Sequence, residues 1–199
     1  VSVSKSYTLG DENSKYRVAI IDVGIKRNII RCLEDRGVYM KVFPFDTDPE
    51  NIFKWNPSGV FFSNGPGNPS AMKNVIKNVK KIIETKIPVF GICLGHQLIA
   101  LASGLNTYKM HNGHRGINHP VFNLITKKCE VTSQNHGFAI EEKSLEGKEN
   151  IKITHRNLND ETIEGICFTD RPCFSVQYHP ESSPGPQDSK YLFDQFILN

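Results

Sequence analysis

The sequence lacks several features that would assign it to a specialised class of protein. Its 199 residues contain no apolar run near the ~20 residues that a membrane-spanning helix needs. The N-terminal segment 1–5 has no apolar core of the kind that a signal peptide carries. The formal net charge is only +3 and the lysines are scattered, so neither a nucleic-acid partner nor a membrane partner is expected.

Cysteine patterns that hold disulfides or zinc are also missing. The chain has five cysteines, an odd number that cannot all pair, and none of them forms a Cys-x-x-Cys pair. No disulfide framework and no metal site are therefore expected, and a reducing, cytoplasmic location is the natural inference. The five are Cys32, Cys93, Cys129, Cys167 and Cys173.

Strand-like and helix-like patterns alternate along the first hundred residues. Compact apolar runs predict strands at 17–23, 38–43, 59–63 and 89–92. Apolar residues at helical spacing and short connecting segments predict helices at 26–36, 49–55, 71–84 and 95–103. This order is typical of an α/β protein with a mostly parallel central sheet flanked by helices.

The pattern changes in the C-terminal half. Short strand candidates with few helices between them predict antiparallel strands appended to the parallel sheet, at 121–125, 130–133, 151–155, 162–168 and 174–178. A final helix is expected at 188–198. Residues 1–16 are polar and aperiodic, so we expect a linker at 1–16 and one domain at 17–199.

One stretch combines a strand, a cysteine and a helix. Cys93 follows an apolar run directly and lies two residues from Gly91 and two from Gly95. This spacing predicts a nucleophile elbow, a sharp strand-to-helix turn that exposes one side chain at the edge of a sheet. A Cβ atom at either glycine would collide with a neighbour or block the turn. The alternative is a buried core cysteine, which is the common fate of a free thiol.

A cysteine nucleophile needs a base and a group that orients the base. His179 ends an apolar strand and precedes Pro180 and Glu181. Because proline restricts itself and the residue before it, the imidazole and the carboxylate are held two residues apart in a stiff geometry. Glu181 is therefore predicted to accept a hydrogen bond from the ring of His179. A turn with a solvated glutamate is the alternative.

Two further polar segments are candidates for binding. The segment 63–67 follows a predicted parallel strand, and the N–H of Gly67 together with the N–H of Leu94 could form an oxyanion hole. Read without Cys93, the same segment is an ordinary turn. The segment 133–138 offers side-chain amides and an aromatic ring that could bind a small polar ligand.

The segments 91–97 and 179–181 together resemble the class I, or triad, glutamine amidotransferases. Within that family, further segments resemble the glutaminase domain of carbamoyl-phosphate synthetase, namely 63–69, 108–110, 113–120, 133–139 and 179–186. The resemblance runs from about residue 17 to the C-terminus. It implies an α/β fold and an enzyme that hydrolyses L-glutamine to glutamate and ammonia through a thioester.

The resemblance also implies roles for individual residues. Cys93 is the implied nucleophile, His179 handles the protons and Glu181 orients His179. The residues implied to contact glutamine are Gly65, Gly67, Leu94, Gln97, Asn135, Gly137 and Phe138.

Partners are implied as well. Ammonia is expected to pass to a carbamoyl-phosphate synthetase large subunit or synthetase domain, which uses ATP and bicarbonate, for pyrimidine or arginine synthesis. No cofactor is expected in this domain, and a further N-terminal small-subunit domain is expected to precede it. The alternatives are another class I amidotransferase, or a catalytically weak regulatory module that binds a synthetase.

Overall fold

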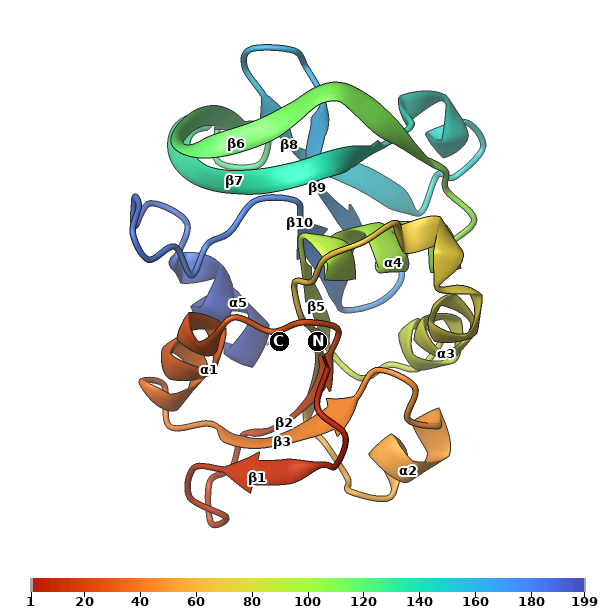
Figure 1. Ribbon diagram of the computed structural model, residues 1–199, viewed down its shortest axis with the longest axis vertical. Coiled ribbons are helices and arrows are strands. Elements are labelled where there is room, and N and C mark those ends of the chain that lie inside the picture. Colours follow the sequence, from red (N-terminus) through yellow and green to blue (C-terminus); the bar gives the residue numbers. More distant parts are fainter. Residues whose placement is uncertain (1, 199) are drawn as a thin grey trace.

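A computed structural model describes residues 2–198 and shows one large mixed sheet with helices on both sides (Figure 1). The strand order is β1-β3-β2-β4-β5-β10-β9-β8-β6-β7. The N-terminal half supplies the parallel strands, which are β2 (Arg17–Asp22), β3 (Tyr39–Pro44), β4 (Gly59–Phe62) and β5 (Val89–Ile92). The predicted α/β class is confirmed.

The helices cover the two faces of this sheet because its central strands are apolar on both sides. In β2, Ala19 and Ile21 belong to one core cluster, whereas Val18 and Ile20 belong to the other. The first cluster packs against α2 (Pro49–Phe53), α3 (Lys73–Ile83) and α4 (Leu94–Ala102), and the second packs against α1 (Arg27–Glu34) and α5 (Tyr191–Leu198). None of the helices described between residues 2 and 198 is long and apolar enough to cross a membrane.

The C-terminal half extends the sheet with antiparallel strands, as expected. Strand β10 (Cys173–Val176) joins the two halves, because it pairs parallel with β5 and antiparallel with β9 (Ile163–Phe168). Beyond β9 lie β8 (Ile151–Asn157) and the two-stranded ribbon of β6 (Thr107–Asn123) and β7 (Lys128–Ile140). Figure 1 shows this ribbon arching over the end of the sheet above α4.

Two expectations about local structure need correction in their extent. The strand predicted at 130–133 is the middle of β7, which has 13 residues, and the strand predicted at 121–125 overlaps only the end of β6, which has 17. Residues 107–120 of β6 and 134–137 of β7 are mostly polar, so they lack the apolar pattern that marks a strand. The segment 1–16, expected to be a linker, contains β1 (Tyr7–Leu9), which pairs antiparallel with β3. Three residues carry too little pattern to be recognised as a strand.

Candidate active site

Cys93 lies at the turn between β5 and α4. Its backbone has φ 53° and ψ −103°, a conformation that a non-glycine residue rarely adopts. Its N–H donates to the carbonyl of Val176 in β10 at 2.9 Å, which holds the turn against the carboxyl end of the neighbouring strand. A strained residue at this position is typical of a nucleophile elbow, so the structure confirms the turn predicted from the glycine spacing.

The two glycines beside Cys93 leave no room for a side chain. A Cβ atom on Gly95 would lie 2.3 Å from the carbonyl oxygen of Phe62. A Cβ atom on Gly91 would lie 2.5 Å from Cδ1 of Ile99 and 2.9 Å from the carbonyl carbon of Gly95. Because real Cβ contacts are never this short, any larger residue would push α4 away from the sheet.

His179 and Glu181 form a hydrogen-bonded pair beside the cysteine. Nδ1 of His179 lies 2.7 Å from Oε1 of Glu181, and both side chains are buried. The His179 backbone N–H donates to the carbonyl of Ser133 in β7 at 2.9 Å, which fixes the height of the imidazole above the sheet. The predicted contact between this imidazole and carboxylate is confirmed.

The electrostatics of this pair favour a protonated imidazole. Burial lowers the pKa of His179, but hydrogen bonds to Cys93 and Glu181 and their charges outweigh it and raise the pKa to about 9. Burial raises the pKa of Glu181, but His179 and then Lys26 outweigh it and hold the pKa below its usual value. The site therefore holds a buried imidazolium between a carboxylate and a sulfur atom.

Residues of the loop before α1 and of its first turn also contact Glu181, which the sequence did not reveal. Nζ of Lys26 lies 3.4 Å from Oε1 of Glu181, and the Asn28 side chain donates to the Glu181 carbonyl. The Lys26 backbone N–H donates to Oδ1 of Asn64 at 2.9 Å. These contacts connect the segments that follow β2, β4 and β10. Because these segments are far apart in the sequence, they meet only when the sheet has assembled.

A pocket of about 540 Å³ opens beside Cys93 and His179. Six of the seven residues predicted to contact glutamine line it: Gly65, Gly67, Gln97, Asn135, Gly137 and Phe138. Leu94, the seventh, is buried at the first position of α4, and its Cδ2 lies 2.9 Å from where a Cβ on Gly65 would stand. The structure thus gathers the predicted residues at one place, while their contacts with glutamine remain a prediction.

The loop after β4 needs glycine at two positions, for different reasons. Gly67 has φ +106°, in the region that favours glycine, and no atom lies within 4 Å of where its Cβ would be. Gly65 is packed so tightly that a Cβ would lie 1.9 Å from the carbonyl oxygen of Val23. One glycine is therefore needed for packing and the other for its dihedral angles.

Cationic side chains that were not among the predicted site residues also line the pocket. They are Lys26, and Lys109 and Arg115 of β6. His136 of β7 borders it as well, together with Gly24, Asn64 and Pro66. Gln97 stabilises one side of the pocket, because its Nε2 donates hydrogen bonds to the carbonyl of Phe138 at 3.1 Å and to Oε1 of Gln177 at 3.0 Å. The first part of β6, residues 107–120, gave no strand signal because a mostly polar strand looks like a loop in sequence.

The arrangement of Cys93, His179 and Glu181 at the carboxyl edge of the sheet can be compared with known proteins. The family model described as "Glutamine amidotransferase class-I" matches residues 19–199. The chain belongs to the class I glutamine amidotransferases.

Within this family the chain is similar to carbamoyl phosphate synthase small chains. It is 53% identical over 181 residues to that of Clostridium acetobutylicum, covering 91% of this chain and 51% of the relative. It is 55% identical over 184 residues to that of Acinetobacter baylyi, covering 92% and 48%. The chain thus spans about half the length of the curated relatives it matches.

Solved structures with the same fold are more distant in sequence. A Thermoplasma acidophilum protein described as part of a GMP synthase superposes with a TM-score of 0.80 at 23% identity, covering 92% of each chain. A glutamine amidotransferase of Thermotoga maritima superposes with a TM-score of 0.67 at 15% identity, covering 86% of this chain and 78% of the other. At these identities the likeness shows the fold of the amidotransferase domain.

Proposed function

We propose that this amidotransferase domain hydrolyses L-glutamine to glutamate and ammonia. The observation that carries the proposal is the buried Cys93–His179–Glu181 arrangement at the mouth of a polar pocket. A nucleophile, a base and an orienting carboxylate are the three groups that acyl transfer from an amide requires. This arrangement supports the roles proposed for the three residues.

In the first half of the reaction, the sulfur of Cys93 attacks the side-chain carboxamide carbon of glutamine and a C–S bond forms. The N–H groups of Gly67 and Leu94 are the proposed donors to the oxyanion. The His179 imidazolium gives its proton to the amide nitrogen, the C–N bond breaks, and ammonia leaves. A glutamyl thioester remains on Cys93.

In the second half, neutral His179 takes a proton from water while the water oxygen attacks the thioester. The C–S bond breaks, glutamate leaves, and the sulfur and the imidazolium return to their first state. Glu181 keeps Nδ1 of His179 protonated throughout, so that the opposite ring nitrogen faces Cys93. The pocket amides, including Asn135, are proposed to hold the substrate's polar groups.

The wider protein is proposed to be the small chain of a carbamoyl-phosphate synthetase. The support is about 50% identity to proteins of that name over most of this chain. Ammonia would then pass to a synthetase partner that uses ATP and bicarbonate, in pyrimidine or arginine synthesis. A reducing, cytoplasmic setting suits the proposal because Cys93 must stay a free thiol.

The test is glutamate release from glutamine by the purified protein, with and without the synthetase partner. A glutamine-analogue electrophile should label Cys93 faster than the exposed Cys129, as measured by peptide mass spectrometry. Replacing His179 with Asn should abolish formation of the thioester in a single turnover. Cys129→Ser is the matched control, and it should retain labelling at Cys93.

Equal labelling of Cys93 and Cys129 would show that the elbow cysteine is not the nucleophile. Turnover retained in His179→Asn would exclude His179 as the proton carrier. Glutamate release with no activation of any synthetase would leave the glutaminase reaction intact and contradict the proposed partner.

A further inference from the structure

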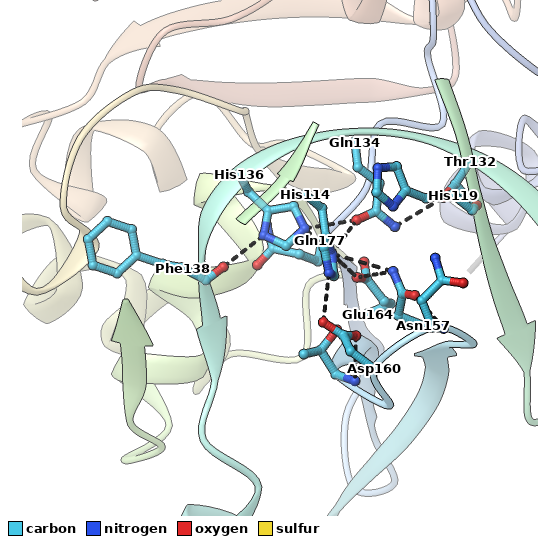
Figure 2. A network of polar contacts seen from close by, with 12 residues as sticks. His114, His119, Thr132, Gln134, His136, Phe138, Asn157, Asp160, Glu164 and Gln177 are labelled. Atoms are coloured by element: carbon cyan, nitrogen blue, oxygen red, sulfur yellow. Dashed lines mark hydrogen bonds and ion pairs between the residues drawn. The ribbon is translucent and has the colours of Figure 1, made fainter. Parts of the chain in front are cut away.

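A cluster of buried polar side chains adjoins the pocket beside Cys93, and no step of the proposed chemistry uses it. His114 of β6 and His136 of β7 are opposite each other in the ribbon, and Glu164 comes from β9. One ligand-type atom from each of the three lies within 4.8 Å of the others, and all three residues are buried. Figure 2 shows these side chains converging with Gln134.

The orientation of the Gln134 amide in this cluster is fixed by its neighbours. Oγ1 of Thr132 donates its only proton to the carbonyl of His119 at 2.9 Å. The Gln134 atom 3.1 Å from that hydroxyl must therefore be the amide nitrogen, acting as donor. It follows that Oε1 of Gln134 faces both imidazoles, 2.8 Å from Nδ1 of His114 and 2.9 Å from Nε2 of His136.

This orientation leaves His136 with an acceptor on each side. Its Nδ1 lies 2.9 Å from the carbonyl of Phe138, so Nδ1 must carry a proton. A neutral imidazole with its proton on Nδ1 presents the lone pair of Nε2 to the lone pairs of Gln134 Oε1, a repulsion that a positive ion between them would remove.

We propose that His114, His136, Glu164 and Gln134 bind one divalent cation, with Zn²⁺ the best match to their chemistry. Two imidazole nitrogens with carboxylate and amide oxygens suit zinc better than Mg²⁺ or Ca²⁺, which prefer oxygen alone. The sequence led us to expect no metal site. The four side chains come from three strands, so no ligand spacing appears in the sequence.

The distances between the ligand atoms fit one small ion. A tetrahedral site with bonds of about 2.0–2.1 Å has ligand-to-ligand distances of roughly 3.3 Å. In addition to the two distances from Gln134, Oε1 of Glu164 lies 3.1 Å from Nδ1 of His114 and 3.8 Å from Nε2 of His136. Four of the six ligand-to-ligand distances thus lie between 2.8 and 3.8 Å, on either side of that value.

The second nitrogen of each histidine has the partner that metal-binding histidines commonly have. Nε2 of His114 lies 2.9 Å from Oδ2 of Asp160, and Nδ1 of His136 faces the Phe138 carbonyl. Such outer contacts fix the ring and increase its basicity toward a metal. In addition, Oε2 of Glu164 is buried without a hydrogen-bond partner, so the carboxylate has spare capacity to bind a cation.

A site with four protein ligands is closed, so its role is structural. The ion would fasten the ribbon to β9 directly behind Asn135, Gly137 and Phe138, which line the pocket. On the basis of the proposed glutaminase function, loss of the ion should raise the KM for glutamine more than it lowers kcat. Metal content is measured without glutamine, so failure of this inference is distinguishable from failure of the proposed function.

The experiment measures metal content in the purified protein, prepared without chelators. Cys93→Ser serves as the background, because Cys93 and His179 could otherwise bind zinc themselves. We expect about one zinc per chain by elemental analysis, and less than a tenth of that in Glu164→Gln and in His114→Gln. After zinc removal, added Co²⁺ should give the intense visible absorption of a tetrahedral site.

His111→Gln is the matched control, because His111 is an exposed histidine on the same strand as His114. It should retain the full metal content. Glu164→Gln keeps nearly the same shape, and circular dichroism with a thermal melt will show whether each variant is folded. Zinc should raise the melting temperature of the stripped background protein and leave that of folded Glu164→Gln unchanged.

A protein that purifies with under a tenth of an equivalent of metal and binds neither Zn²⁺ nor Co²⁺ would overturn the proposal. The cluster would then be a metal-free network in which His114 carries the charge. Burial lowers the pKa of His114, but hydrogen bonds to Glu164 and Asp160 outweigh it and raise the pKa to about 9. Full metal content in both ligand variants would likewise place the ion elsewhere.

Discussion

Nδ1 of His179 lies 2.7 Å from Oε1 of Glu181, and the two residues are separated by one proline. The proline makes this contact local, so it needs no long-range packing to form. The contact with Cys93 is different, because the cysteine comes from another strand more than eighty residues earlier in the chain. The catalytic arrangement therefore combines a pair formed within three consecutive residues with Cys93, which only the folded sheet brings close to them.

Replacing Glu181 with Gln should lower kcat for glutamine hydrolysis by roughly 10²–10⁴-fold, by analogy with amide replacement in other triads. The amide nitrogen would favour the tautomer of His179 in which the proton faces Cys93. Steady-state kinetics provide the measurement, and KM should change little. Lys26→Gln is the control, because this half-exposed lysine only assists Glu181 and its loss should cost far less. Wild-type kcat in Glu181→Gln would rule out the orienting role.

The imidazole of His179 should titrate with a pKa of about 9 in the free protein. Replacing Cys93 with Ser should lower that pKa, because the contact with the sulfur is one cause of its elevation. Nuclear magnetic resonance of labelled histidine side chains will show both values. His155 is the internal control, because burial lowers its pKa to about 4 in a different part of the sheet. An unchanged His179 pKa in Cys93→Ser would argue against the cysteine contact.

Protonation of His179 should also make stability depend on pH. The pKa of His179 is about 9 in the folded protein and has an ordinary value of 6.5, which we take for the unfolded chain. The stabilisation that comes from protonating His179 is therefore fully present below pH 6.5. The contribution decreases as the pH rises through about 9 and is absent above it. Urea unfolding of wild type and His179→Asn between pH 6 and 10 will measure the difference in unfolding free energy. A difference that stays constant over this range would refute the raised pKa.

Replacing Gly95 with Ala should destabilise the protein by about 3 kcal/mol or more, the upper range for overpacking a core. The new Cβ would lie 2.3 Å from the Phe62 carbonyl, and neither backbone can move without displacing β4 or α4. Gly37→Ala is the control, since Gly37 has φ +68° with open space around it and should cost only about 1–2 kcal/mol. Denaturant unfolding gives both values. Equal losses of unfolding free energy in Gly95→Ala and Gly37→Ala would mean that the elbow tolerates a side chain at residue 95.

Much of the parallel half could be predicted from the sequence because its strands are buried on both faces. The apolar run 89–92 coincides with β5, and the strand predicted at 17–23 differs from β2 by one residue. The ribbon of β6 and β7 could not be predicted in the same way. Buried positions alternate along β7, but they hold polar side chains such as Glu130, Thr132, Gln134 and His136, so hydropathy does not reveal the whole strand.

The sequence by itself determined the elbow, the His-Pro-Glu pair and the alternation that makes an α/β sheet. These features depend on residues close together in the chain, where glycine spacing, proline restriction and apolar runs act directly on the backbone. Only the tertiary structure decided which loops surround Cys93, that Lys26 supports Glu181, and that His114, His136 and Glu164 meet. Those contacts join residues on different strands, and strand order and register are set by packing of the whole sheet.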